Sequence, residues 1–163
     1  MRKETGMFWE VPLLNSLHLL LAVIWVGGMF FAWVCLRPVA GREIQGLQRA
    51  RLWHGVLARF LGIVWLAAIG LPLTGYRMAF YYFGGPAGFP LYVNLMQALG
   101  WLMIFLFAYV FFGPWRRLGQ AIRDGVPENA ADALGRIRRA VGFNLLLGLL
   151  LVAMVGAGRI LGF

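Results

Sequence analysis

The sequence predicts an all-α membrane protein, built as an up-down bundle of four transmembrane helices in a single domain spanning residues 1–163. Of the 163 residues, 61% are hydrophobic and only 13% are charged. Soluble domains carry about a quarter charged residues. The charges are also segregated, because arginines gather in two connecting segments and leave long apolar runs between them. Composition and segregation together indicate helices that cross a bilayer.

Four runs are long enough for spans, since a transmembrane helix needs about 20 mostly apolar residues. They are expected at residues 11–36, 56–83, 91–112 and 141–163. The first run is longer than the roughly 7–15 apolar residues of a signal peptide core. We therefore expect it to be retained as the first helix. A helix beginning near Asn129 is expected to run into the fourth span.

The connecting segments predict the orientation. Segments 37–55 and 113–140 are rich in arginine, whereas the short Gly/Pro turn at 84–90, between helices 2 and 3, has no charge. Positively charged loops stay in the cytoplasm. Both basic loops are therefore expected there, with both termini and the turn outside, in a bacterial-type inner membrane. The net charge of +9 then indicates contact with a lipid bilayer and not with nucleic acid. Other membrane redox subunits or further copies of the chain are additional candidate partners.

His18 is the main candidate for a functional site because it is an ionisable residue inside the first span. Such residues are costly in lipid and are candidate functional residues by default. At a rise of about 1.5 Å per residue, polar residues of the other spans fall at a similar depth in the outer half. These residues are Arg77, Asn94, Gln97 and Arg159. We expect a shared polar layer.

Two cofactors suit such a layer. Haem would take His18 as axial ligand, with Arg77 and Arg159 facing its propionates and Trp25 lining an apolar pocket. Copper is the alternative, with His18 and Met96 as ligands, because Cu(I) prefers imidazole and sulfur donors. A third hypothesis is a small structural subunit of a larger membrane redox complex.

The other histidine and the single cysteine add little to the layer. His54 is expected at the opposite membrane face, too far from His18 for one haem to bridge both. The lone cysteine, Cys35, excludes an internal disulfide and a CxxC zinc motif. No acid/base constellation distinguishes an enzyme from an electron carrier.

Four stretches resemble a known family. HLLLAVIWVGGMF (18–30) followed by LRP (36–38) looks like the opening helix of CopD copper-resistance membrane proteins. GPWRRL (113–118) and IRRAVGFNL (137–145) are similar to short members of that group. The resemblance implies copper handling across the inner membrane. A more distant similarity to HemJ-type proteins, which carry haem b on an intramembrane histidine, implies haem b on His18.

Overall fold

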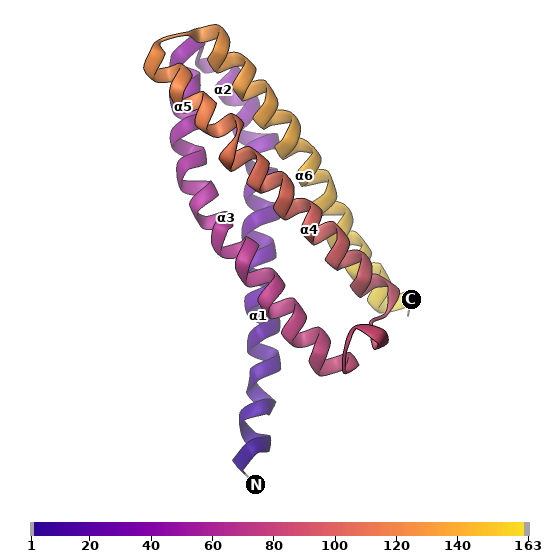
Figure 1. The fold of residues 1–163 in the computed structure, drawn as a ribbon. Coiled ribbons are helices and arrows are strands. Elements are labelled where there is room, and N and C mark those ends of the chain that lie inside the picture. Colours follow the sequence, from indigo (N-terminus) through magenta and orange to yellow (C-terminus); the bar gives the residue numbers. More distant parts are fainter. Residues whose placement is uncertain (1, 162–163) are drawn as a thin grey trace.

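The computed structural model describes the backbone of residues 2–161 and the side chains of residues 9–156. Every described secondary-structure element is a helix (Figure 1). In chain order the elements are α1 (Arg2–Phe30), the π-helix η1 (Phe31–Leu36), α2 (Arg37–Glu43), α3 (Gly46–Phe83), the 3₁₀ turn η2 (Pro86–Gly88), α4 (Leu91–Phe112), α5 (Pro114–Asp124) and α6 (Pro127–Leu161).

Four segments of the described chain are long and apolar enough to cross a membrane, which confirms the predicted all-helical, four-span architecture. They are Trp9–Glu43, Gly46–Phe83, Leu91–Asp124 and Pro127–Gly156. The helices extend well into the segments predicted as loops. Only short breaks remain in 37–55, where Ile44 and Gln45 adopt extended backbone, and in 113–140, where Gly125 is left-handed with φ 70°. The predicted helix that runs into the fourth span is confirmed, but α6 begins at Pro127, so Asn129 lies in its first turn and does not cap it.

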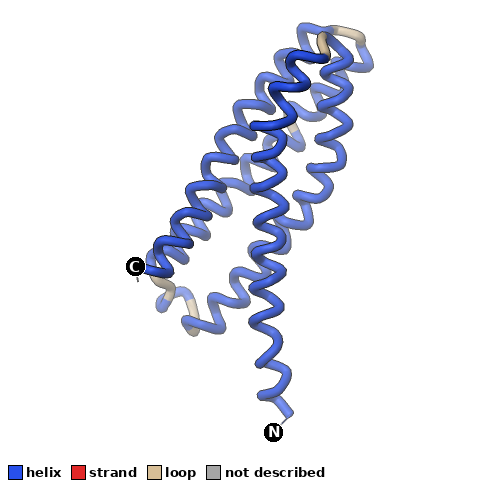
Figure 2. Tube along the Cα trace, turned by 180° about the vertical axis from the view of Figure 1, so that it is seen from behind, coloured by secondary structure: helices blue, strands red, loops and turns tan. Residues whose placement is uncertain are grey.

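The bundle has two different ends (Figures 1 and 2). We call one the basic end: it holds α2, α5 and the first turns of α3 and α6. We call the other the terminal end: it holds the start of α1, the turn around η2 and the end of α6. α1 packs mainly on α3, and α4 mainly on α6. The two pairs meet toward the basic end and diverge toward the terminal end (Figures 1 and 2).

The buried core lies where the two helix pairs meet. Trp25 of α1 is 3% exposed and packs edge-on against Phe107 of α4, with ring centroids 6.0 Å apart. Trp65 of α3 makes a similar contact with Phe107, at 4.9 Å. Many large apolar side chains elsewhere on the bundle are exposed, including Leu66 and Phe105. In a spanning protein such residues face lipid, so the aromatic centre provides the interior packing.

Small residues allow close helix contacts at particular points. A Cβ atom added at Gly142 of α6 would lie 2.5 Å from Cη2 of Trp33, and one added at Gly70 of α3 would lie 2.5 Å from Cδ1 of Leu21. Real Cβ atoms essentially never approach other atoms so closely. Glycine at these positions therefore lets a bulky side chain of α1 or η1 lie directly on a neighbouring helix backbone.

A π-helical turn interrupts the first span. The backbone N–H of Arg37 donates to the carbonyl of Ala32, five residues earlier, instead of four. Pro38 follows directly and has no N–H to donate to the carbonyl four residues before it. Single π turns inside α-helices commonly lie at functional sites. Within this turn Trp33 packs against α6 at Gly142, and Arg37, directly after the turn, lies at the basic end.

Candidate functional site

His18 lies between α1 and α3, half-buried, and is hydrogen-bonded to one side chain. Its Nδ1 is 2.8 Å from Oγ1 of Thr74. The Thr74 hydroxyl is 2.6 Å from the carbonyl of Gly70 in its own helix, and Thr74 is 4% exposed. A hydroxyl has a single proton to donate. Because that proton goes to the Gly70 carbonyl, we assign Nδ1–H of His18 as the donor to Thr74.

This tautomer leaves the Nε2 atom of His18 with a lone pair. A ring nitrogen that donates to a neighbour fixes both the tautomer and the orientation of the imidazole, which is how metal-binding histidines are usually held. Gly75 adds to the arrangement, since a Cβ atom there would lie 3.2 Å from Cε1 of His18. Thr74 thus hydrogen-bonds the imidazole, and the missing side chain of Gly75 leaves room for the ring to pack against α3.

Arg77, predicted as a cofactor partner, forms an ion pair with the chain's own Glu10. Nη2 of Arg77 and Oε1 of Glu10 are 2.7 Å apart, and their side chains are 49% and 36% exposed. This pair also joins α1 to α3, one turn beyond Thr74. The guanidinium charge is thus already balanced by a carboxylate from the first helix.

The polar residues of α4 have other surroundings. Nδ2 of Asn94 donates to the carbonyls of Phe89, at 3.1 Å, and Pro90, at 3.3 Å, and so fixes the start of the helix. Nε2 of Gln97 is buried without a hydrogen-bond partner, and Met96 beside it is half-buried. Within the described side chains, no hydrogen bond or ion pair joins Asn94 or Gln97 to His18.

The structure therefore brings together two pairs between α1 and α3, His18 with Thr74 and Glu10 with Arg77. Arg159 belongs to α6, but its side chain lies outside the described residues. Sequence reasoning singled out His18 and Arg77 and missed the partners Gly75 and Glu10. Glu10 carried a usable signal, because a lone acid at the start of a span can balance a lone arginine at the same depth.

The donor atoms at His18 suit a small set of ligands. Among residues with described side chains, there is no group of three or more His, Cys, Asp and Glu residues that could hold a metal. In the part of the chain with described side chains, His18 therefore belongs to no cluster of the kind that holds zinc. Cu(I) accepts imidazole and thioether donors at low coordination number, whereas zinc sites usually need three or four N, O or thiolate ligands.

His54 is far from this site in the fold and is held by packing. Its ring stacks on Trp115 of α5, with centroids 5.2 Å apart and an interplanar angle of 9°. A Cβ atom at Gly119 would lie 2.8 Å from Nε2 of His54, so α5 fits closely around the ring. The position at the start of α3, near the basic end, agrees with the expectation that His54 and His18 lie at opposite ends of the bundle.

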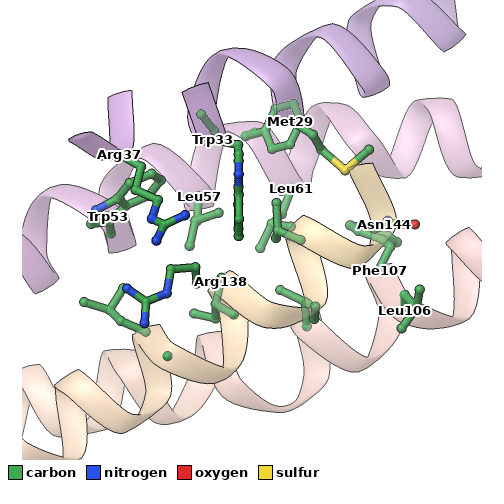
Figure 3. A pocket seen from close by; sticks show the side chains of 18 of the residues that line it. Met29, Trp33, Arg37, Trp53, Leu57, Leu61, Leu106, Phe107, Arg138 and Asn144 are labelled. Atoms are coloured by element: carbon green, nitrogen blue, oxygen red, sulfur yellow. The ribbon is translucent and has the colours of Figure 1, made fainter. Parts of the chain in front are cut away.

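A cavity of about 370 Å³ lies in the half of the bundle near the basic end (Figure 3). Trp25 and Met29 of α1 line it, as do Trp33 and Arg37, whereas His18 is not among its lining residues. Trp25 thus lines a pocket, but not one beside His18, so its expected place in a cofactor site at His18 stays a prediction. Asn144 lines it as well, at 4% exposure, with an Oδ1 atom that has no hydrogen-bond partner.

Comparison with known proteins places the chain in a family. The family model described as CopD, copper resistance protein D, matches residues 54–157, which include Thr74, Arg77 and Arg138 but not His18. No curated protein and no solved structure matches the chain. The match covers more than half of the sequence and confirms the resemblance drawn from its motifs. The chain is a multi-pass membrane protein that belongs to the CopD copper-resistance family.

Proposed function

We propose that this protein handles copper within the membrane and that His18 is a ligand for Cu(I). The observation that carries the proposal is the hydrogen bond between Nδ1 of His18 and Oγ1 of Thr74, at 2.8 Å. With Nδ1–H assigned as its donor, the lone pair that can bind a metal lies on Nε2. Membership of the CopD family supports the choice of metal. An imidazole with its second nitrogen held by a neighbour is the usual form of a metal ligand.

Met96 of α4 is the proposed thioether ligand. It is half-buried and lies near the start of α4, next to the turn around η2. The α4–α6 pair diverges from the α1–α3 pair toward this end (Figure 1). Ligation of one metal by His18 and Met96 would therefore require the two pairs to approach each other there. Soft sulfur and imidazole donors select Cu(I) over the harder cations of the cell.

The proposed orientation puts the basic end in the cytoplasm. Ten arginines lie in segments 37–55 and 113–140, and positively charged segments beside the spans are retained on the cytoplasmic side. Both termini and the turn around η2 would then face outward, in a bacterial-type inner membrane. Copper would meet His18 in the outer half of the bilayer.

A Cu(I) titration against a competing chelator tests the proposal on the purified full-length protein. His18→Ala should weaken binding at least tenfold, because it removes the imidazole donor. His54→Ala is the matched control, since it removes the other histidine, which stacks on Trp115. Equal binding by wild type and His18→Ala, with both proteins folded by circular dichroism, would contradict the assignment.

Haem b on His18 is the second candidate, because the same free Nε2 atom is an axial ligand for haem iron. The optical spectrum separates the two. A Soret band in the purified protein that disappears in His18→Ala would favour haem. Cu(I) binding that depends on His18, in a protein without a Soret band, would favour copper.

A further inference from the structure

The cavity near the basic end has the composition of a binding site for an amphiphile. Its volume of about 370 Å³ falls in the range of roughly 300–1,000 Å³ typical of small-molecule sites. Met29, Leu106, Phe107 and Asn144 lie toward one end of it, and Arg37, Trp53 and Arg138 toward the other (Figure 3). Apolar and positively charged surfaces are thus separated along its length.

Three arginines from three helices line this cavity: Arg37 of α2, Arg49 of α3 and Arg138 of α6. No carboxylate lines it. The ion pairs between described side chains use other arginines, Arg77 with Glu10 and Arg136 with Asp132. Like charges gathered next to apolar walls repel each other more strongly than in water. A bound anion would offset that repulsion.

The charged end is also pre-arranged. The guanidinium carbon of Arg37 lies 4.4 Å from the centroid of the Trp33 ring, which is a cation–π contact. Trp33 in turn rests on the backbone of α6 at Gly142. The side chains of Trp33 and Arg37 are therefore already held in place by their neighbours. They lose less conformational entropy when a ligand binds.

We propose that this cavity binds a single-chain amphiphile with an anionic head, its carboxylate or phosphate on Arg37, Arg49 and Arg138 and its alkyl chain between Trp25, Met29 and Phe107. The apolar depth favours an amphiphile over a free anion, and three arginines with no carboxylate among the described lining residues disfavour a cationic head. A free fatty acid and a lysophospholipid share this chemistry. The site is independent of His18 and of copper.

The test is the thermal unfolding midpoint of the purified full-length protein in a neutral maltoside detergent. A ligand that binds only the folded state raises the midpoint in proportion to its occupancy. Dodecanoate should raise it, whereas acetate, inorganic phosphate and dodecyltrimethylammonium should not. A shift by dodecanoate alone identifies a free acid as the ligand, and a shift by lauroyl lysophosphatidylglycerol alone identifies a lysophospholipid.

Variants locate the effect. Arg37→Gln combined with Arg138→Gln should abolish the shift, while Arg116→Gln, an arginine at the same end that lies over Phe112 at 5.1 Å, should retain it. Gly135→Leu adds a side chain where a Cβ atom meets nothing within 4 Å at the cavity wall, and should also abolish it. Gly55→Leu, equally uncrowded but outside the lining, is its control.

Three results would overturn the proposal: an equal shift with acetate or phosphate, an equal shift with the cationic amphiphile, or a full shift in the Arg37→Gln, Arg138→Gln double variant. His18→Ala should retain the dodecanoate shift. Loss of copper binding with an intact dodecanoate response therefore separates this site from the proposed copper function.

Discussion

The imidazole of His18 is oriented by a threonine whose own proton is already used within its helix. Threonine hydroxyls in membrane helices often donate to the carbonyl four residues earlier, and Thr74 does so to Gly70 at 2.6 Å. The hydroxyl can then act only as an acceptor toward His18. Thr74 is uncharged, so it lies in the membrane without the energy penalty of a charged residue. With Nδ1–H as the donor to Thr74, Nε2 is the histidine nitrogen that can bind a ligand.

Thr74→Val should weaken Cu(I) binding by about 10–100-fold, the usual cost of losing a residue that orients a metal ligand. The isosteric side chain removes the acceptor for Nδ1–H while it keeps the packing at a position that is 4% exposed. Chelator competition measures the change. Thr74→Ser keeps the hydroxyl and should bind as the wild type does; equal affinity of Thr74→Val and wild type would contradict the role.

Arg77→Gln should leave Cu(I) binding unchanged and lower the free energy of unfolding by ~1 kcal/mol or less, as expected for a substantially exposed ion pair. Its partner is Glu10, and both side chains are more than a third exposed. Denaturant unfolding in detergent gives the stability. A loss of metal or haem binding in Arg77→Gln would instead support the cofactor role expected from the sequence.

His18 could be identified from the sequence because one ionisable residue in an apolar run is conspicuous. Its direct contact with Thr74 could not, because the contact joins residues 56 positions apart and depends on the rotation of α3 about its axis. The same limit explains the polar layer. Depth follows from residue counting, but the side of the helix on which Asn94 and Gln97 lie depends on the packing of α4, which residue counting does not determine.

At the scale of helices, some glycines lie where a neighbouring side chain packs directly against the helix backbone, and others face open space. The sequence contains many glycines in its spans, and Gly28, Gly70, Gly142 and Gly148 would each place an added Cβ atom against a neighbouring side chain. Gly27 and Gly62 meet nothing within 4 Å. Composition alone cannot make this distinction, because it depends on which helix face meets a neighbour.

Gly142→Ala should destabilise the bundle by about 1–3 kcal/mol, the usual cost of overpacking, because the new methyl group meets the ring of Trp33 at 2.5 Å. Gly62→Ala is the matched control and should be neutral or slightly stabilising, since alanine favours helix. Denaturant titration of both in the same detergent compares them. Equal stability of the two variants would contradict the close contact.

Helix ends were the least predictable elements. Segments 37–55 and 113–140 look like loops because they are charged, yet nearly all of their residues are helical. Charge sets where a helix leaves the bilayer, and not where it stops. The actual stops need a local backbone reversal, as at Gly84, whose φ of 73° suits glycine and whose N–H bonds back to the carbonyl of Phe80.

At the scale of the whole molecule, the two sites lie in different halves of one bundle. The α1–α3 pair holds His18 in the half where the pairs diverge, and all four spans surround the cavity in the half where they meet. Class and span number follow from hydropathy, so they could be predicted. The cavity could not, because it arises from how four helices and a π turn fit together.

The proposed orientation predicts the labelling of single cysteines introduced in a Cys35→Ser background. Ala87→Cys, in the exposed turn η2, should react with a membrane-impermeant maleimide in spheroplasts. Asn129→Cys, exposed near the start of α6, should react only after permeabilisation. The reverse pattern would place the basic end outside and contradict the orientation.

The π turn at Phe31–Leu36 also constrains how the gene for this protein can change. Removing one residue from a helix rotates everything beyond it by about 100° relative to what precedes it. The π turn already holds one residue more than an α-helical turn, because Arg37 bonds to Ala32 five residues earlier. A deletion that converted it to a regular α-helix would therefore absorb the missing residue locally and keep Arg37 on the face of Trp33. Single-codon deletions should therefore be better tolerated in this turn than elsewhere in the first span.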